Sequence, residues 1–228
     1  MYMYCYPGVK ELELHAMDNI TLPAPNLRIG DRAPGFSARS TAGDIALADY
    51  RGKWLLLFSH PADFTPVCTS EFVALASAER QFAQLNCQLV ALSVDSLFSH
   101  FAWIRAISDR FDVEVRFPIV EDPTLVIGSA YGMVSNDAAD SATMRTTFFI
   151  DPEGIVRATQ CYPATVGRSV DEMLRTLQAL QAVDANGGLA PANWQPGQEM
   201  LLPAQPTLDS VLSAKNPSDW FFSSGDKP

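Results

Sequence analysis

The sequence contains four cysteines but lacks a closely spaced Cys-x-x-Cys pair, and this absence excludes several kinds of site. Structural zinc sites and thioredoxin-type dithiol centres are usually built on such a pair. The cysteines instead stand singly, at Cys5, Cys68, Cys87 and Cys161. We therefore expect no metal and no dithiol centre, but one reactive cysteine among incidental ones.

Long hydrophobic runs are also missing. The longest, residues 54–58, has the length of a single strand, whereas a membrane-spanning helix needs about 20 apolar residues. Residues 1–10 contain no basic cluster followed by an apolar stretch, so no secretory signal is predicted. These absences favour a cytoplasmic protein without a membrane partner, in a compartment where thiols stay reduced.

Positive charge is scarce. The chain has 16 lysines and arginines against 26 aspartates and glutamates, which gives a formal net charge of −10. Such a chain is repelled by nucleic acid phosphates and by anionic membrane surfaces, so nucleic acid is not an expected partner either. A small neutral substrate is not affected by this charge.

The residues that are present alternate between buried-strand and amphipathic-helix patterns. Continuous apolar runs predict buried strands at 54–58 and 88–94, and a turn at 151–154 predicts an antiparallel hairpin over 146–159. Apolar residues at helical spacing predict helices at 69–86, 97–111, 122–131 and 170–183. Strands that alternate with helices, together with the hairpin, predict an α/β fold with a mixed central sheet flanked by helices.

Composition divides the chain into three parts. Residues 1–28 show no sustained period and form an N-terminal extension that we expect to be partly disordered. Residues 29–186 contain the predicted strands and helices. Residues 187–228 are rich in proline and form a C-terminal arm or subdomain. Aromatic residues in this arm, such as Trp220, are expected to dock on the same chain or on a neighbouring subunit.

The segment between the first buried strand and the following helix contains residues that suit a nucleophile. Thr65 is a good N-cap, and Pro66 suits the first helical position. Cys68 then lies in the first turn, near unpaired backbone N–H groups and the positive end of the helix dipole, which favours the nucleophilic thiolate. The Thr65 hydroxyl can accept from a backbone N–H and donate toward the sulfur, and Pro61 can cover one wall of the pocket.

A lone cysteine in a helix is more often a small core residue than a nucleophile. The spacing of Pro61, Thr65 and Cys68 at a strand-to-helix junction favours the nucleophile here. Residues 60–71 resemble the active-site signature of the peroxiredoxins, Pro-x-x-x-Thr/Ser-x-x-Cys, and are most similar to the 1-Cys, peroxiredoxin-6-type branch. The resemblance extends over residues 27–222, with further matching segments at 30–36, 91–96, 100–103, 117–119, 162–168 and 194–203.

The resemblance implies a thioredoxin-like fold and a thiol-dependent peroxidase that serves antioxidant defence and redox homeostasis. Cys68 would be the peroxidatic cysteine, with Thr65 and Pro61 in its pocket. Arg145 matches an arginine of the family, whose permanent charge would stabilise the thiolate and polarise the peroxide.

Three further residues match supporting positions of the family. Glu71 and Arg168 would orient Arg145 or pair with each other, although a purely structural salt bridge would look the same. His60 would shape the pocket, or would be a satisfied histidine at the end of a strand.

The implied reaction is attack of the Cys68 thiolate on hydrogen peroxide or an alkyl hydroperoxide, which leaves a sulfenic acid and needs no cofactor. The arm contains no resolving cysteine, Cys87 and Cys161 are expected to be structural, and Cys5 lies in the loose extension. We therefore expect a 1-Cys mechanism, in which an external thiol such as thioredoxin or glutathione reduces the sulfenic acid. The family also implies a homodimer or a larger homo-oligomer such as a decamer.

Two other functions stay open on the sequence alone. One is a cysteine hydrolase that combines Cys68 with a histidine base, for which His60 is close in sequence. A hydrolase has no need of Arg145, so this arginine separates the two enzyme classes. The other is a redox-sensing or chaperone-like oligomer, a role that could coexist with catalysis.

Overall fold

The computed structural model describes residues 27–134, 141–214, 216 and 218–225. The predicted N-terminal extension, residues 1–28, therefore lies almost entirely outside the described residues, as does Cys5. The described strands are β1 (Ser37–Ser40), β2 (Gly43–Ala46), β3 (Trp54–Ser59), β4 (Cys87–Ser93), β5 (Ile119–Glu121), β6 (Arg145–Ile150) and β7 (Val156–Tyr162).

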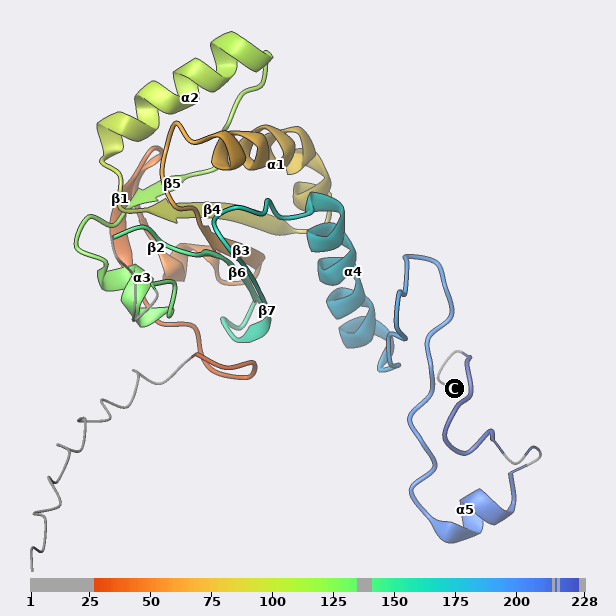
Figure 1. Ribbon diagram of the computed structural model, residues 1–228. Helices are drawn as coiled ribbons and strands as arrows, with labels where there is room; N and C mark the ends of the chain where they lie inside the picture. The colour runs from red at the N-terminus through yellow and green to blue at the C-terminus, as the bar shows by residue number, and fades with distance from the viewer. Residues whose placement is uncertain (1–26, 135–140, 215, 217, 226–228) are drawn as a thin grey trace, which may run out of the picture.

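These strands form one seven-stranded sheet in the order β2-β1-β5-β4-β3-β6-β7 (Figure 1). β3, β4 and β5 run parallel to one another, whereas β6 and β7 form the predicted antiparallel hairpin, and β1 and β2 form a second one. The mixed sheet confirms the predicted α/β class.

Helices cover both faces of the sheet. They are the short 3-10 helix η1 (Leu47–Tyr50) and the α-helices α1 (Pro66–Gln84), α2 (Leu97–Phe111), α3 (Val126–Ala130), α4 (Val170–Asn186) and α5 (Leu208–Leu212). Alternate residues of β3 point to opposite faces. Leu56 and Phe58 pack with α1, α2 and α4, whereas Leu55 and Leu57 pack with η1 and α3. A strand that is buried on both faces has no polar alternation, which is why residues 54–58 form a continuous apolar run.

The helix predicted at 122–131 is wrong at its start, because α3 begins only at Val126. Leu125 has a left-handed backbone, with φ of 57°, which interrupts a helix. The Leu125 N–H instead donates to the carbonyl oxygen of Asp122 at 3.0 Å, which closes a turn over residues 122–125, and the Asp122 carboxylate accepts from the Gly128 N–H at 2.7 Å. The sequence also missed β5, whose 3 residues are too few to show a period.

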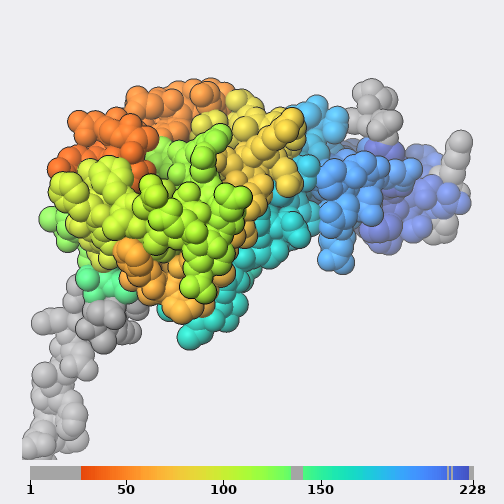
Figure 2. All heavy atoms as spheres, turned by 90° about the horizontal axis from the view of Figure 1, so that it is seen from above, coloured from red at the N-terminus to blue at the C-terminus, as the bar shows by residue number. Residues whose placement is uncertain are grey.

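The C-terminal residues extend beyond α4 and away from the sheet (Figures 1 and 2). α4 ends at Asn186 and is followed by Gly187, which has a left-handed backbone that glycine adopts without strain. The following chain contains two isolated β-bridges, between Leu189 and Leu201 and between Leu201 and Ser224. Trp194 is buried, but Phe222 is 63% exposed, so the aromatic residues of the arm are only partly covered by their own chain. Within the described residues, no helix combines the length and the apolar character needed to cross a membrane.

Candidate active site

Cys68 lies where the sequence predicted it, in the first turn of α1. β3 ends at Ser59, residues 60–65 form a loop, and α1 begins at Pro66 with Thr65 as its N-cap. We call residues 60–65 the active-site loop. The side chain of Cys68 is completely buried. Its sulfur accepts a hydrogen bond from Arg145 Nη1 at 3.3 Å.

Arg145 is the first residue of β6 and is itself only 2% exposed. The antiparallel pairing of β6 with β3 places it next to the loop that follows β3. Its guanidinium is held at both ends. Nη1 donates to Glu71 Oε2 at 2.8 Å, and Nε and Nη2 donate to the carbonyl oxygen of Ala164 at 3.1 and 2.8 Å. These bonds keep Nη1 directed at the Cys68 sulfur.

Glu71 lies one turn after Cys68 on α1 and is paired with a second arginine. Arg168 Nε and Nη2 donate to the two carboxylate oxygens at 2.9 and 2.8 Å, and the Arg168 backbone N–H donates to Oε1 at 2.8 Å. Burial by itself raises the pKa of the Glu71 carboxyl. The hydrogen bonds and charge of Arg168, together with the charge of Arg145, outweigh burial, so the pKa lies below its ordinary value.

The three charged side chains of this buried cluster do not balance one another. Arg145 and Arg168 each carry a positive charge, and Glu71 carries one negative charge, so the three side chains together leave an excess positive charge. A buried charge is costly unless it is balanced. A Cys68 thiolate, in contact with Arg145 Nη1, would supply the missing negative charge.

Thr65 and Pro61 are the other two loop residues that the sequence placed in the pocket. The Thr65 hydroxyl does not cap α1; it donates to the carbonyl oxygen of Ala62 at 2.9 Å. The prediction that it accepts from a backbone N–H was therefore wrong, because the side chain is turned toward the loop and not toward the first turn of α1. For the same reason its proton is directed at Ala62 and not at the Cys68 sulfur. Pro61 is half-buried in the same loop.

His60 contacts a carboxylate that the sequence did not single out. Its Nε2 lies 2.9 Å from Asp63 Oδ1, and Nδ1 of His100, on α2, lies 2.8 Å from Asp63 Oδ2. The imidazoles are completely buried. Burial is the main cause that lowers the pKa of His60 below its ordinary value. Burial would raise the pKa of Asp63, but the hydrogen bonds from His100 and His60 outweigh it and bring the pKa to about 2.

The donor atoms of His60, Asp63 and His100 lie within 4.8 Å of one another, close enough to be considered as metal ligands. Within the described residues, the distal ring nitrogens, His60 Nδ1 and His100 Nε2, have no hydrogen-bond partner. A metal on the near nitrogens would force protons onto these distal atoms and leave two buried N–H donors unsatisfied, whereas metal-bound histidines normally donate from the distal nitrogen. The residues therefore fit a hydrogen-bonded triad better than a metal site.

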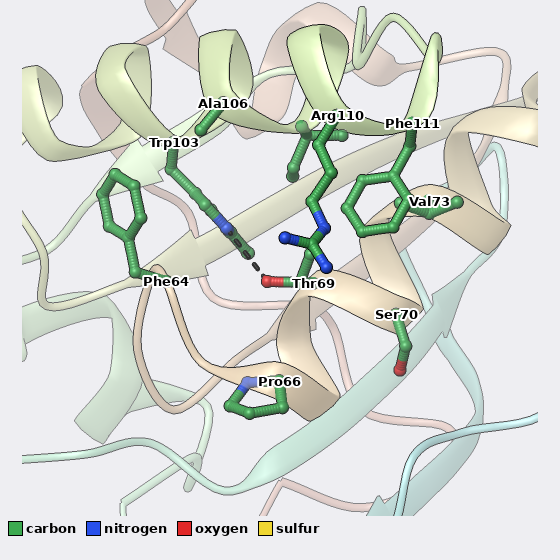
Figure 3. Close-up of a pocket in the computed structure, with 10 residues that line it drawn as sticks. Phe64, Pro66, Thr69, Ser70, Val73, Trp103, Ala106, Arg110 and Phe111 are labelled. Carbon is green, nitrogen blue, oxygen red and sulfur yellow. Dashed lines mark hydrogen bonds between the residues drawn. The ribbon is translucent and has the colours of Figure 1, made fainter.

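A groove of about 640 Å³ lies beside the site, between α1 and α2 (Figure 3). Its walls are aromatic and aliphatic, and the guanidinium of Arg110 projects into it. Trp103 Nε1 donates to Thr69 Oγ1 at 3.2 Å along one side. Pro66 and Thr69 line the groove on either side of Cys68 in sequence, but Cys68 itself points into the core.

The two other cysteines in the described part of the chain differ from each other. Cys87 opens β4 and is buried, as expected, and burial raises the pKa of its thiol to about 12. Cys161 was also expected to be structural rather than resolving, and its side chain is exposed on β7. It is exposed because β7 lies at the edge of the sheet, where fewer elements cover its side chains.

Comparison with known proteins assigns the chain to a family. The family model described as the AhpC/TSA family matches residues 29–159. Peroxiredoxin 2 of Caldanaerobacter subterraneus subsp. tengcongensis is 46% identical over 220 residues, which cover 92% of this chain and 98% of that protein. The chain belongs to the peroxiredoxin family. A second model, described as the C-terminal domain of 1-Cys peroxiredoxin, matches residues 179–214 of this peroxiredoxin.

Solved structures agree with this assignment. A yeast mitochondrial 1-Cys peroxiredoxin superposes with a TM-score of 0.79 at 36% identity, covering 88% of this chain and 100% of that one. Peroxiredoxin 6 of Arenicola marina superposes with a TM-score of 0.78 at 30% identity, covering 89% and 99%. The thioredoxin-like fold and the similarity to 1-Cys, peroxiredoxin-6-type proteins are thus confirmed. As a peroxiredoxin, the protein is a thiol-dependent peroxidase, and hence an oxidoreductase.

The alternative of a cysteine hydrolase finds no support in the site. Both described imidazoles bond to Asp63, and within the described residues the hydrogen bond to the Cys68 sulfur comes from Arg145. The triad residues Asp63 and His100 were missed by the sequence analysis. They stand 37 positions apart, and no local pattern signals a contact over that separation.

Proposed function

We propose that Cys68 is the peroxidatic cysteine and that Arg145 is its electrostatic partner. The observation that carries the proposal is the 3.3 Å contact between Arg145 Nη1 and Cys68 Sγ, within a buried cluster whose other charges sum to a positive excess. Glu71 and Arg168 act as positioning residues, because they hold the guanidinium through the carboxylate. Thr65, Pro61 and His60 belong to the loop that encloses the sulfur.

In the proposed reaction, the Cys68 thiolate attacks the terminal oxygen of a hydroperoxide. The S–O bond forms as the O–O bond breaks, which leaves a sulfenic acid on Cys68. The departing hydroxide or alkoxide takes a proton from water and leaves as water or an alcohol. Arg145 stabilises the negative charge that moves from the sulfur to the departing oxygen, which is the role of a preorganised cationic donor. Hydrogen peroxide and alkyl hydroperoxides are the proposed substrates.

We further propose that the sulfenic acid is reduced by an external thiol. One thiol condenses with it to a mixed disulfide and water, and a second thiol releases Cys68 and carries away the disulfide. Cys87 pairs with Trp54 at the start of β3, whereas Cys68 follows the end of β3. The 6 residues of this strand span about 17 Å, so Cys87 lies near the opposite end of β3 from Cys68 and is an unsuitable partner.

Cys161 is an unsuitable partner for a different reason. It lies opposite Thr146 in the β6–β7 ladder, and Thr146 Oγ1 donates to its sulfur at 3.5 Å. Successive residues of a strand face opposite sides of the sheet. Arg145, which contacts Cys68, therefore faces one side, and Thr146 with Cys161 faces the other, so the sheet lies between the two sulfurs.

The proposal also covers the thiol that reduces Cys68 and the oligomer in which the protein works. The yeast relative is described as resolved through glutathione and thioredoxin systems, and a thiol of this class is proposed here. We place the peroxidase domain at residues 29–186 and a dimer-associated arm at 187–228, in a homodimer or a larger ring such as a decamer. A redox-sensing or chaperone-like role of that oligomer would coexist with catalysis.

Rapid mixing with hydrogen peroxide tests the assignment of Cys68. The wild type should consume one equivalent in a fast phase and gain a sulfenic acid on Cys68, detected by mass spectrometry after trapping. Cys68→Ser should lose the fast phase, and Cys87→Ser, a buried control, should keep it. Fast consumption by Cys68→Ser would refute the assignment.

Turnover with dithiothreitol tests the 1-Cys mechanism. A variant in which Cys5, Cys87 and Cys161 are all replaced by serine should turn over at the wild-type rate, because no step needs a second cysteine of the chain. A large loss of turnover in this variant, with the fast phase intact, would show that one of the three cysteines resolves the sulfenic acid.

A further inference from the structure

Cys68 is completely buried, and this creates a difficulty for the external thiol. A disulfide requires the two Cβ atoms to approach within about 4 Å. The carbon skeleton of an attacking thiol would therefore have to occupy space that the active-site loop and the first turn of α1 now fill. Hydrogen peroxide is far smaller and needs a much smaller opening. If the proposed 1-Cys mechanism is correct, the loop must open between oxidation and reduction.

The contacts of Asp63 hold this loop in place. The Asp63 side chain accepts from His60 within the loop and from His100 on α2, at 2.9 and 2.8 Å. Its backbone N–H donates to Asp95 Oδ2 at 2.9 Å, beyond the end of β4. Three bonds thus converge on one loop residue, and two of them tie the loop to segments outside it. We call these three bonds the Asp63 latch.

On each of the two histidines, one ring nitrogen can be assigned as the donor to Asp63. His60 Nδ1 and His100 Nε2 are buried and have no partner in the described part of the chain. Buried N–H donors without a partner are rarer in folded proteins than buried acceptors without one. A ring proton is therefore assigned to His60 Nε2 and to His100 Nδ1, the two atoms that face Asp63. Each histidine donates to the carboxylate from one defined ring position.

The neighbouring residue opposes the latch. Phe64 has a left-handed backbone with φ of 56°, and its side chain is 58% exposed. For a residue other than glycine, this conformation is strained and persists only where the surroundings enforce it. Release of Asp63 would let Phe64 return to an ordinary conformation, so the strain favours an open loop and the latch favours a closed one.

We propose that the Asp63 latch sets the fraction of molecules in which Cys68 is accessible to a thiol, and that Asp63 and His100 are positioning residues for the reductive half of the cycle. This rests on the proposed 1-Cys mechanism. The closed loop holds Cys68 against Arg145 for reaction with peroxide. The open loop exposes the sulfenic acid to the reductant.

Two substitutions of His100 form a matched test, because His100 is outside the cysteine–arginine cluster. Asn places an N–H donor close to the position of Nδ1, so His100→Asn retains the bond to Asp63. Gln places its donor near the position of Nε2, so His100→Gln loses that bond. Both are neutral amides, so they differ mainly in where the donor lies. Should His100→Gln fail to fold, Asp95→Ala provides the same test, since it removes the acceptor of the Asp63 N–H at a partly exposed position.

Hydrogen exchange reports the latch without any chemistry at Cys68. In His100→Gln, amides of residues 62–69 should exchange about tenfold faster than in the wild type, as expected for the loss of one hydrogen bond to a charged group. Amides of β3 and α4 should be unchanged, and His100→Asn should resemble the wild type. Equal exchange in the two variants, or faster exchange throughout the protein in His100→Gln, would overturn the proposal.

Single-turnover reduction connects the latch with the reaction. Protein that has been oxidised with one equivalent of peroxide is mixed with dithiothreitol, and the loss of the Cys68 sulfenic acid is followed. The second-order rate constant should rise about tenfold in His100→Gln and stay at the wild-type value in His100→Asn. An unchanged rate in His100→Gln, with faster loop exchange, would show that opening does not control reduction. Absence of any sulfenic acid on Cys68 would instead refute the proposed function and leave the exchange result standing.

Discussion

Arg145 contacts three groups at once: the Cys68 sulfur, the Glu71 carboxylate and the Ala164 carbonyl oxygen. A guanidinium presents its donors in a fixed planar arrangement, which a lysine ammonium cannot reproduce. The bonds to Glu71 and Ala164 therefore determine where Nη1 points. The positive charge near the sulfur and the orientation of the guanidinium should contribute separately to the rate of reaction with peroxide. The two contributions can be measured separately.

Arg145→Lys should lower the second-order rate constant for hydrogen peroxide by about 100-fold, the typical effect of losing one preorganised donor at a developing charge. The substitution keeps the charge but gives up the bonds to the Ala164 carbonyl. Stopped-flow oxidation of Cys68 measures the effect. Arg157→Lys is the matched control, since Arg157 pairs with Asp184 at a partly exposed position. A wild-type rate in Arg145→Lys would show that charge alone is sufficient.

At the scale of elements, the sequence predicted the bounds of a helix correctly where they depend on residues close together in the chain. The start of α1 was predicted from Thr65 and Pro66, and the bounds of α2 agree with the predicted 97–111. Caps and apolar periods involve residues within a few positions of one another, so they can be read directly. The turn at residues 122–125 was missed because it depends on the left-handed backbone of Leu125, which no side-chain pattern announces.

The active-site loop should contribute to stability in a pH-dependent manner through Asp63. The pKa of its carboxyl falls from 3.8 to about 2 in the folded protein. A carboxyl with a lowered folded pKa stabilises the protein fully above its unfolded value and loses this contribution as the pH falls through the folded value. The contribution is about 2 kcal/mol, complete above about pH 5 and lost toward pH 2.

Urea unfolding of the wild type and Asp63→Asn across this range measures the contribution. The difference in unfolding free energy should be constant above about pH 5 and should shrink by about 2 kcal/mol as the pH falls toward the folded pKa. Asn does not titrate, so other carboxyl groups cancel in the difference. A difference that does not vary with pH would show that the bonds to His60 and His100 do not stabilise the ionised form.

At the scale of the whole molecule, the C-terminal arm presents more apolar surface than its own chain covers. Phe221 and Phe222 are 54% and 63% exposed, and Leu208 and Leu212 on α5 are 71% and 74% exposed. Exposed apolar residues that gather on one projecting segment are typical of an interface. This is consistent with the proposed association of the arm with a second subunit.

Replacement of both Phe221 and Phe222 by serine should weaken that association. Sedimentation velocity should show a shift toward smaller species at a protein concentration where the wild type is assembled, because two aromatic anchors have been removed. Val126→Ser is the control, since Val126 is 69% exposed on α3, outside the arm. An unchanged size distribution in the double variant would exclude these residues from the interface.

The sequence by itself determined the class of fold, the position of Cys68 in the first turn of a helix and, through resemblance, the family. These features depend on local periods, on caps and on a short motif, all of which lie within continuous stretches of chain. The resemblance also named Arg145 as the partner of Cys68, but only the tertiary structure showed how it reaches the sulfur and which residues hold the loop. The pairing of β6 with β3 brings Arg145 to the sulfur, and the packing of α2 brings His100 to Asp63. Contacts between distant segments depend on the sheet order and on the burial of charge, which no local pattern encodes.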